Sequence, residues 1–164
     1  MTVAASGKYA VRLDEVRDLI AASAAFRTWT GTANAAAAKL RAHVGWFPDG
    51  TTMPLALVDH LGMSAEKVSS ASEFDVTGYV IGVLFEAEAP TASVSTYMDE
   101  IYSFLNTISS IEDEMLTELN SDPGSYPSII GFDGPEFGWP DPDNAAGGVR
   151  RYDARYMFQI NGHT

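Results

Sequence analysis

SEFDVTGYVIGVLFEAEA, residues 72–89, is the stretch that decides the fold. Its side chains alternate between two faces, and both faces are apolar. Gly78 and Gly82 fall on the second face, where missing side chains admit another backbone, so we expect a helix to pack there. A strand that is apolar on both sides is predicted to be central in its sheet. The first face carries Tyr79, Ile81, Val83 and Phe85, and the second carries Val76, Val80 and Leu84.

The next segment, SVSTYMDEIYSFLNTISSIEDEMLTELNS at 93–121, predicts the helix that covers this strand. Apolar residues recur at helical spacing over about six turns. Asp99 and Glu100 lie in the first turn, where negative charge is favourable, and Asp122-Pro123-Gly124 ends the helix. The apolar stripe comprises Tyr97, Ile101, Phe104, Leu105, Ile108, Ile111, Met115 and Leu119.

Outward from this pair, shorter elements are predicted on both sides. A helix is expected over 13–26 and a second, capped by Thr32 or Asn34, before Gly45. TTMPLALVDHL at 51–61 predicts a strand. Because Pro54 lacks an N–H, it belongs at the start of this strand or on a sheet edge, and we prefer the edge. RRYDARYMFQI at 150–160 predicts a half-buried strand with one polar face.

These elements predict one α/β (α+β) domain over residues 1–164. Its mixed or antiparallel sheet would pack against the long helix and the shorter N-terminal helices. The length suits one domain, and 46% hydrophobic residues are typical of a globular protein. The chain has no cysteine, which excludes disulfides and thiol catalysis. We expect neither a signal peptide nor a membrane-spanning segment.

Residues 131–149 hold eight Gly or Pro, which predicts an unusually long loop. Three large aromatic residues lie in it: Phe132, Phe137 and Trp139. Such side chains either pack back on their own domain or anchor an interface.

The charges are segregated along the chain. The net charge is −12, and residues 68–149 contain 15 acidic residues and no Lys or Arg. A surface of this kind repels phosphate, so DNA binding through a basic patch is disfavoured.

No catalytic signature is present, and we expect neither an enzyme nor a cofactor. Walker, GxGxxG, GxSxG and HExxH motifs are all missing. His43, His60 and His163 share no motif spacing. DPDN at 141–144 offers oxygen ligands but lacks the pattern of an EF-hand, and its residues are good turn formers, so no metal site is expected.

Four acids in the last turns of the long helix oppose the helix dipole, at a cost of roughly a few tenths of a kcal/mol each. Either they form a solvated face, or they meet a cationic partner surface or line a channel that carries nucleic acid. They are Glu112, Asp113, Glu114 and Glu118.

The order of the parts resembles the tail terminator family of long-tailed bacteriophages, also described as minor tail or tail-completion proteins. The resemblance rests on AFRTWTGTANAAAAKLRAHV, MPLALV, FDVTGYVIGVLFE, YMDEIYSFLNTISSIEDEML and RYMFQI, in that order. It implies a virion protein, assembled in the host cytoplasm, that forms a hexameric ring. This ring would cap the tail tube, stop its polymerisation and join it to the head-proximal connector, with DNA passing through.

Cyclic rings use heterologous contacts, and segregated charge suits them. We therefore hypothesise that Arg150, Arg151 and Arg155 approach acids of a neighbouring subunit. Three alternatives remain open: another phage neck or head-tail connector subunit, a small cytoplasmic enzyme with an acidic cleft, and an acidic protein that mimics DNA.

Overall fold

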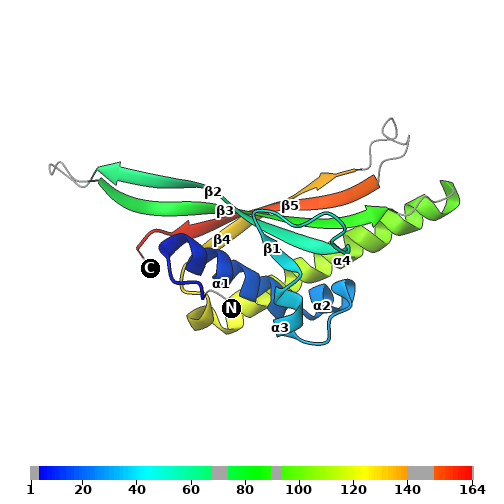
Figure 1. Cartoon of the computed structure of the whole chain (residues 1–164), viewed down its shortest axis with the longest axis horizontal. Helices are drawn as coiled ribbons and strands as arrows, with labels where there is room; N and C mark the ends of the chain where they lie inside the picture. The colour runs from blue at the N-terminus through cyan, green and yellow to red at the C-terminus, as the bar shows by residue number, and fades with distance from the viewer. Residues whose placement is uncertain (1–3, 68–73, 90–93, 140–149, 164) are drawn as a thin grey trace.

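The computed structural model describes residues 4–67, 74–89, 94–139 and 150–163. A twisted sheet forms one layer, and the helices lie along one of its faces (Figure 1). No helix in these ranges is long and apolar enough to span a membrane. The elements are α1 Lys8–Ala22, α2 Ala24–Thr30, α3 Ala35–Lys39, β1 Ala42–Val44, β2 Leu55–Lys67, β3 Phe74–Ala89, α4 Val94–Ser121, a 3-10 turn Pro123–Ser125, β4 Ile129–Gly138 and β5 Arg150–Asn161.

The sheet has five strands in the order β1-β2-β3-β5-β4. β1 runs parallel to β2, and the other neighbours are antiparallel, so the sheet is mixed. This confirms the predicted α+β class. β3 is central as predicted, between β2 and β5, and the predicted long helix is α4. α4 begins at Val94, so the expectation that Asp99 and Glu100 lie in its first turn is wrong.

The helices cover the face of β3 that carries Tyr79, Ile81, Val83 and Phe85, all of them buried. Phe26 of α2 packs edge-on against Phe85 at 5.9 Å, and Phe104 of α4 stacks on Tyr152 of β5 at 5.7 Å. The expectation that a helix packs on the Val80 face is therefore wrong. A Cβ added to Gly82 would lie 2.8 Å from Leu61 Cδ1, so the missing side chain makes room for a residue of β2.

The N-terminal helix predicted over 13–26 is two helices, because the chain bends at Ser23. The Ser23 side chain accepts a hydrogen bond from Phe26 N at 3.0 Å and so begins α2. The second predicted helix is α3, with Asn34 as its cap. It ends early because Ala42–Val44 pair with β2 as a strand.

β2 begins after Pro54 and runs further than predicted, to Lys67. It is not an edge strand over Ala56–Val58, because these residues pair with β1. Beyond Val58 its outer side has no strand partner among the described residues, so the edge prediction is correct only for that part.

The long loop predicted over 131–149 is wrong for its first part, because residues up to Gly138 belong to β4. β4 lies at the sheet edge, where Pro135 removes no hydrogen bond between strands. A register shift between Asp133 and Glu136 takes up Gly134, whose φ is 136°. Residues 140–149, which include the DPDN segment, lie outside the described residues.

Candidate protein interaction surfaces

Three of the four acids singled out on α4 have partners inside the chain. The Tyr156 hydroxyl donates a hydrogen bond of 2.7 Å to Glu112 Oε2. Burial raises the pKa of the Tyr156 phenol, and the neighbouring Glu112 raises it further. Similarly, Tyr126 donates to Glu118 Oε1 at 3.1 Å, and burial together with Glu118 raises the pKa of Tyr126 to about 12.

Glu114 has a different internal role, because it binds the start of α2. Its Oε2 accepts from Ser23 Oγ at 2.7 Å and from Ala25 N at 2.9 Å. It therefore satisfies a backbone N–H that the helix itself leaves without an acceptor. Asp113 alone of the four is fully on the exposed side of α4. A cationic partner is not needed to explain the other three.

Arg151 and Arg155 of β5 lie on the face of the sheet opposite the helices. Arg151 is 3.9 Å from Glu86 Oε1 and stands over the ring of Phe47 at 5.9 Å. Burial raises the pKa of Glu86, an effect that Arg151 opposes and Asp153 reinforces. Arg155 is exposed and in register with Leu84 on one side and Glu136 on the other.

The side chain of Arg150 lies outside the described part of the structure. Contact of these arginines with a neighbouring subunit stays a prediction.

The three aromatic residues of the predicted loop differ in how they pack. Phe132 stacks on Phe158 at 4.9 Å, and Phe137 lies edge-on to Phe104 at 6.3 Å, so both pack back on the core. Trp139 stacks on Phe137 at 5.6 Å but remains 47% exposed. Two of the three aromatics are therefore accounted for within the domain.

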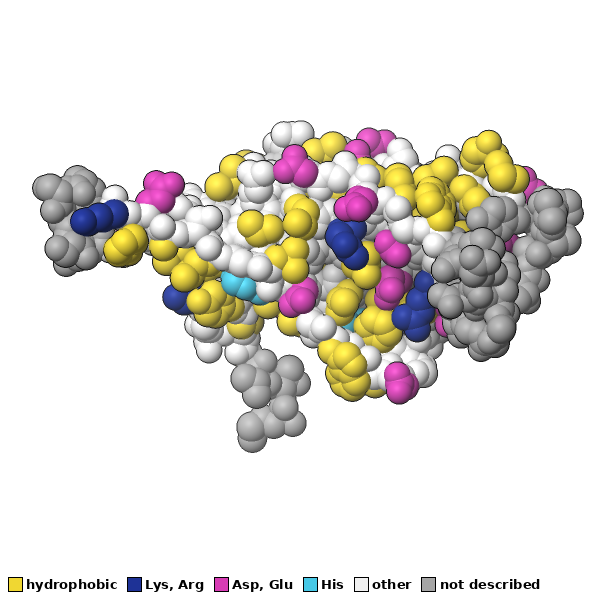
Figure 2. Space-filling model, turned by 90° about the horizontal axis from the view of Figure 1, so that it is seen from above, with side chains coloured by type: hydrophobic (Ala, Val, Ile, Leu, Met, Phe, Trp, Pro, Cys, Tyr) yellow, Lys and Arg dark blue, Asp and Glu magenta, His cyan; other side chains and the backbone are white. Residues whose placement is uncertain are grey.

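Sequence reasoning missed the uncovered face of the sheet, here called the outer face. Leu61 is 50% exposed and Met157 is 41% exposed. A shallow cavity of 240 Å³ lies between them, lined also by Leu84, Asp59 and Arg155. Figure 2, which views the sheet from above, shows hydrophobic side chains along this face among scattered charged groups. The feature of the sequence that could have revealed the outer face is the second apolar face of β3, which we predicted to pack against a helix.

The three histidines are dispersed. His60 packs edge-on against Tyr9 at 4.8 Å, and His43 lies 5.9 Å from Phe47. Burial lowers the pKa of His43, and the charges of Arg41 and Arg17 lower it further. His163 is 3.4 Å from Asp75 near the C-terminus. No group of three potential metal ligands occurs in the described ranges.

A groove of 920 Å³ lies between α2 and α4. Trp29 and Tyr102 line it together with small polar residues and two carboxylates, Asp99 and Glu114. Because Glu114 is already bound to α2, this groove does not hold a convergent pair of acids.

The fold and these surfaces define an acidic α+β domain with one helix-covered sheet face and one face that the described residues leave partly uncovered. No known protein family matches the sequence, and no curated protein is significantly similar to it.

Proposed function

We propose that this protein is a phage tail terminator: a subunit of a ring that caps the tail tube, stops its polymerisation and joins it to the head-proximal connector. The observation that carries the proposal is the outer face of the sheet. Leu61 and Met157 are exposed there beside a shallow cavity, and no layer of the described chain covers them. A contiguous apolar surface on one face of a sheet is typical of a protein that contacts another protein.

The charge distribution supports the same function. The net charge is −12, and the segment 68–149 contains no cation. An acidic ring lets DNA pass because it repels phosphate rather than holding it. The resemblance in the order of the elements adds the family context, and the α+β architecture agrees with the fold that this resemblance implies.

Electron microscopy of phage particles that lack the protein tests the proposal. We expect tails of uncontrolled length that fail to join heads, and restoration by the wild-type chain. Tails of normal length that fail to join heads would instead favour another neck or connector subunit. Normal particles would reject both assignments and leave the enzyme and DNA-mimic alternatives.

A variant of the outer face sharpens this test. Leu61→Glu places a charge in the uncovered apolar surface and is expected to fail in restoring the particles, although the isolated chain still folds because Leu61 is half exposed. Asn106→Glu is the matched control, since Asn106 is exposed on α4, away from that face. Equal restoration by both variants would show that the outer face makes no essential contact.

A further inference from the structure

Three apolar side chains are exposed at the β1 edge of the sheet, and we call this surface the β1 flank. Leu40 and Trp46 are each 71% exposed, and Val44 is 46% exposed. Leu40 and Val44 border a groove of 740 Å³, lined otherwise by four alanines, Leu13 and the charged residues Asp14, Arg17 and Lys39. Tryptophan is among the residues that most often dominate binding energy in protein interfaces.

A second apolar surface lies at the β4 edge, and we call it the β4 flank. Ile130 is 67% exposed and Leu116 is 44% exposed. They border a groove of 320 Å³ formed between the end of α4 and the start of β4, with Tyr126 and Phe132 in its lining. This groove is large enough to receive bulky side chains from a partner.

The two flanks differ in charge: cations and acids mix at the groove of the β1 flank, whereas the β4 flank lies in a segment whose charged residues are all acidic. The segment 19–48, which builds α2, α3 and β1, contains Arg27, Lys39 and Arg41 and no acid. The β4 flank belongs to the segment without any Lys or Arg, and Asp113, Asp122 and Asp133 each lie within three positions of a residue that lines its groove. Lys39 is paired with Asp14 and Asp18, whereas the Arg41 guanidinium binds only carbonyl oxygens, those of Thr52 and Pro54, among the contacts described.

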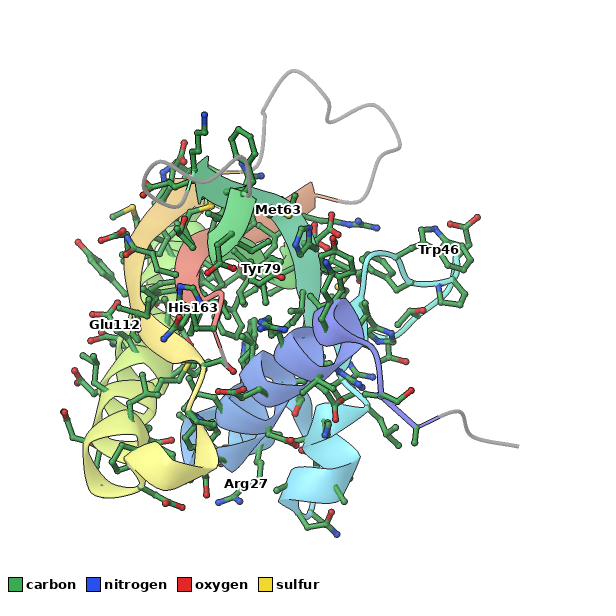
Figure 3. The ribbon with its side chains drawn as sticks, turned by 90° about the vertical axis from the view of Figure 1, so that its left-hand side faces the viewer. Arg27, Trp46, Met63, Tyr79, Glu112 and His163 are labelled. Atoms are coloured by element: carbon green, nitrogen blue, oxygen red, sulfur yellow. The ribbon has the colours of Figure 1, made fainter. Side chains whose placement is uncertain are left out.

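The flanks also face away from each other. β1 and β4 are the two ends of the strand order. In Figure 3, Trp46 projects on one side of the molecule, and Glu112 marks α4 on the opposite side. One copy cannot bring its own flanks together, so complementary surfaces placed in this way pair between successive copies, head to tail.

We propose that the β1 flank of one copy binds the β4 flank of the next, with Trp46 and Leu40 against the groove beside Leu116 and Ile130. The occupant of each flank is thus a second copy of this chain. The proposal rests on the proposed function for its closure into a ring, since head-to-tail contacts form rings only when the rotation closes.

Cysteine cross-linking tests the pairing, because the chain has no cysteine of its own. Val44→Cys and Ile130→Cys place one thiol on each flank and leave Trp46 intact. With a short thiol-reactive cross-linker, the double variant is expected to give a ladder of covalent oligomers. An equal mixture of the two single variants is expected to stop at dimers, because each linked pair has used both of its thiols.

Each single variant alone is expected to give little product. Dimers from a single variant as abundant as those from the mixture would indicate two-fold or random contact and overturn the proposal. Absence of a ladder from the double variant would also overturn it. Ser64→Cys with Asn106→Cys, exposed positions outside both flanks, measures the background of random collision.

A substitution at the predicted centre of the contact gives a second readout. Trp46→Glu is expected to raise the concentration needed for oligomers by at least roughly 30-fold, the usual effect of losing an interface anchor. An unchanged concentration would overturn the role of the β1 flank. A ladder combined with normal particles in the absence of the protein would support the flank pairing and reject the proposed function, whereas defective tails without a ladder would do the reverse.

Discussion

Both faces of β3 are apolar, but the two faces of the sheet have different surroundings. On the inner face, Ile81, Tyr156 and Phe158 are completely buried under the helices. On the outer face, Leu61 and Met157 remain about half exposed beside a shallow cavity. The contrast teaches that an apolar pattern on both sides of a strand shows that both sides are suited to burial, but not which chain buries them.

Substitutions at two neighbouring residues of β5 test the difference between the two faces directly. Phe158→Ala is expected to lower the free energy of unfolding of the isolated chain by about 3–5 kcal/mol, because it opens a cavity among fully buried side chains. Met157→Ala, one residue away on the outer face, is expected to cost about 1 kcal/mol or less. Chemical denaturation measures both values. Equal losses would show that the outer face is covered in the isolated chain.

The elements that sequence predicted best are those with long local patterns. β3 and α4 were recognisable because their apolar periodicity extends over many residues and needs no distant partner. The break between α1 and α2 was missed because alanines continue the helical pattern, while the carboxylate that binds the bend, Glu114, lies 91 residues from Ser23. β4 was missed because counting Gly and Pro ignores the tolerance of an edge strand for both.

The candidate site was less predictable for the same reason. Glu112 and Glu118 looked like a surface cluster, since nothing local reveals that Tyr156 and Tyr126 donate hydrogen bonds to them. The apolar residues of the outer face and of the two flanks can be identified in the sequence, but their exposure cannot. Their exposure depends on the packing of the whole sheet.

Two adjacent acids of α4 sharpen the contrast between internal and external side chains. Glu114→Ala is expected to destabilise the chain by about 1–3 kcal/mol, since it removes a carboxylate that accepts from Ser23 Oγ and Ala25 N. Asp113→Ala is expected to change stability by about 0.5 kcal/mol or less, because Asp113 is exposed. Thermal or urea unfolding distinguishes them. A large loss for Asp113→Ala would mean that it too has an internal role.

The phenol of Tyr156 gives a smaller effect on the inner face. Tyr156→Phe removes the hydrogen bond to Glu112 and keeps the ring, so we expect a loss of about 1 kcal/mol in the free energy of unfolding. Tyr102→Phe is the control, because Tyr102 is 56% exposed on α4. If the two substitutions behave alike, the bond between Tyr156 and Glu112 does not stabilise the fold.

Substitution of Glu86 is expected to have the smallest effect on stability. It tests the end of the outer face that is covered by the chain itself. The segment after β1 covers this end of the face, where Leu55 is buried and Phe47 lies beside Arg151. Burial raises the pKa of Glu86 above its ordinary value of 4.5, so the folded chain holds this proton at a pH where the unfolded chain has lost it. The stability that Glu86 contributes is therefore complete below pH 4.5 and is lost as pH rises through its folded pKa.

Glu86→Gln has no such titration. The free energy of unfolding of this variant, measured relative to wild type by urea denaturation, is expected to increase as pH rises above 4.5 and then to level off. Arg151→Gln is expected to enlarge the loss of stability with rising pH, because Arg151 opposes the rise in the pKa of Glu86. In the double variant with Glu86→Gln, this pH-dependent loss of stability is expected to be absent. A constant difference between Glu86→Gln and wild type across this range would mean that water reaches Glu86. In that case the outer face would be uncovered along its whole length.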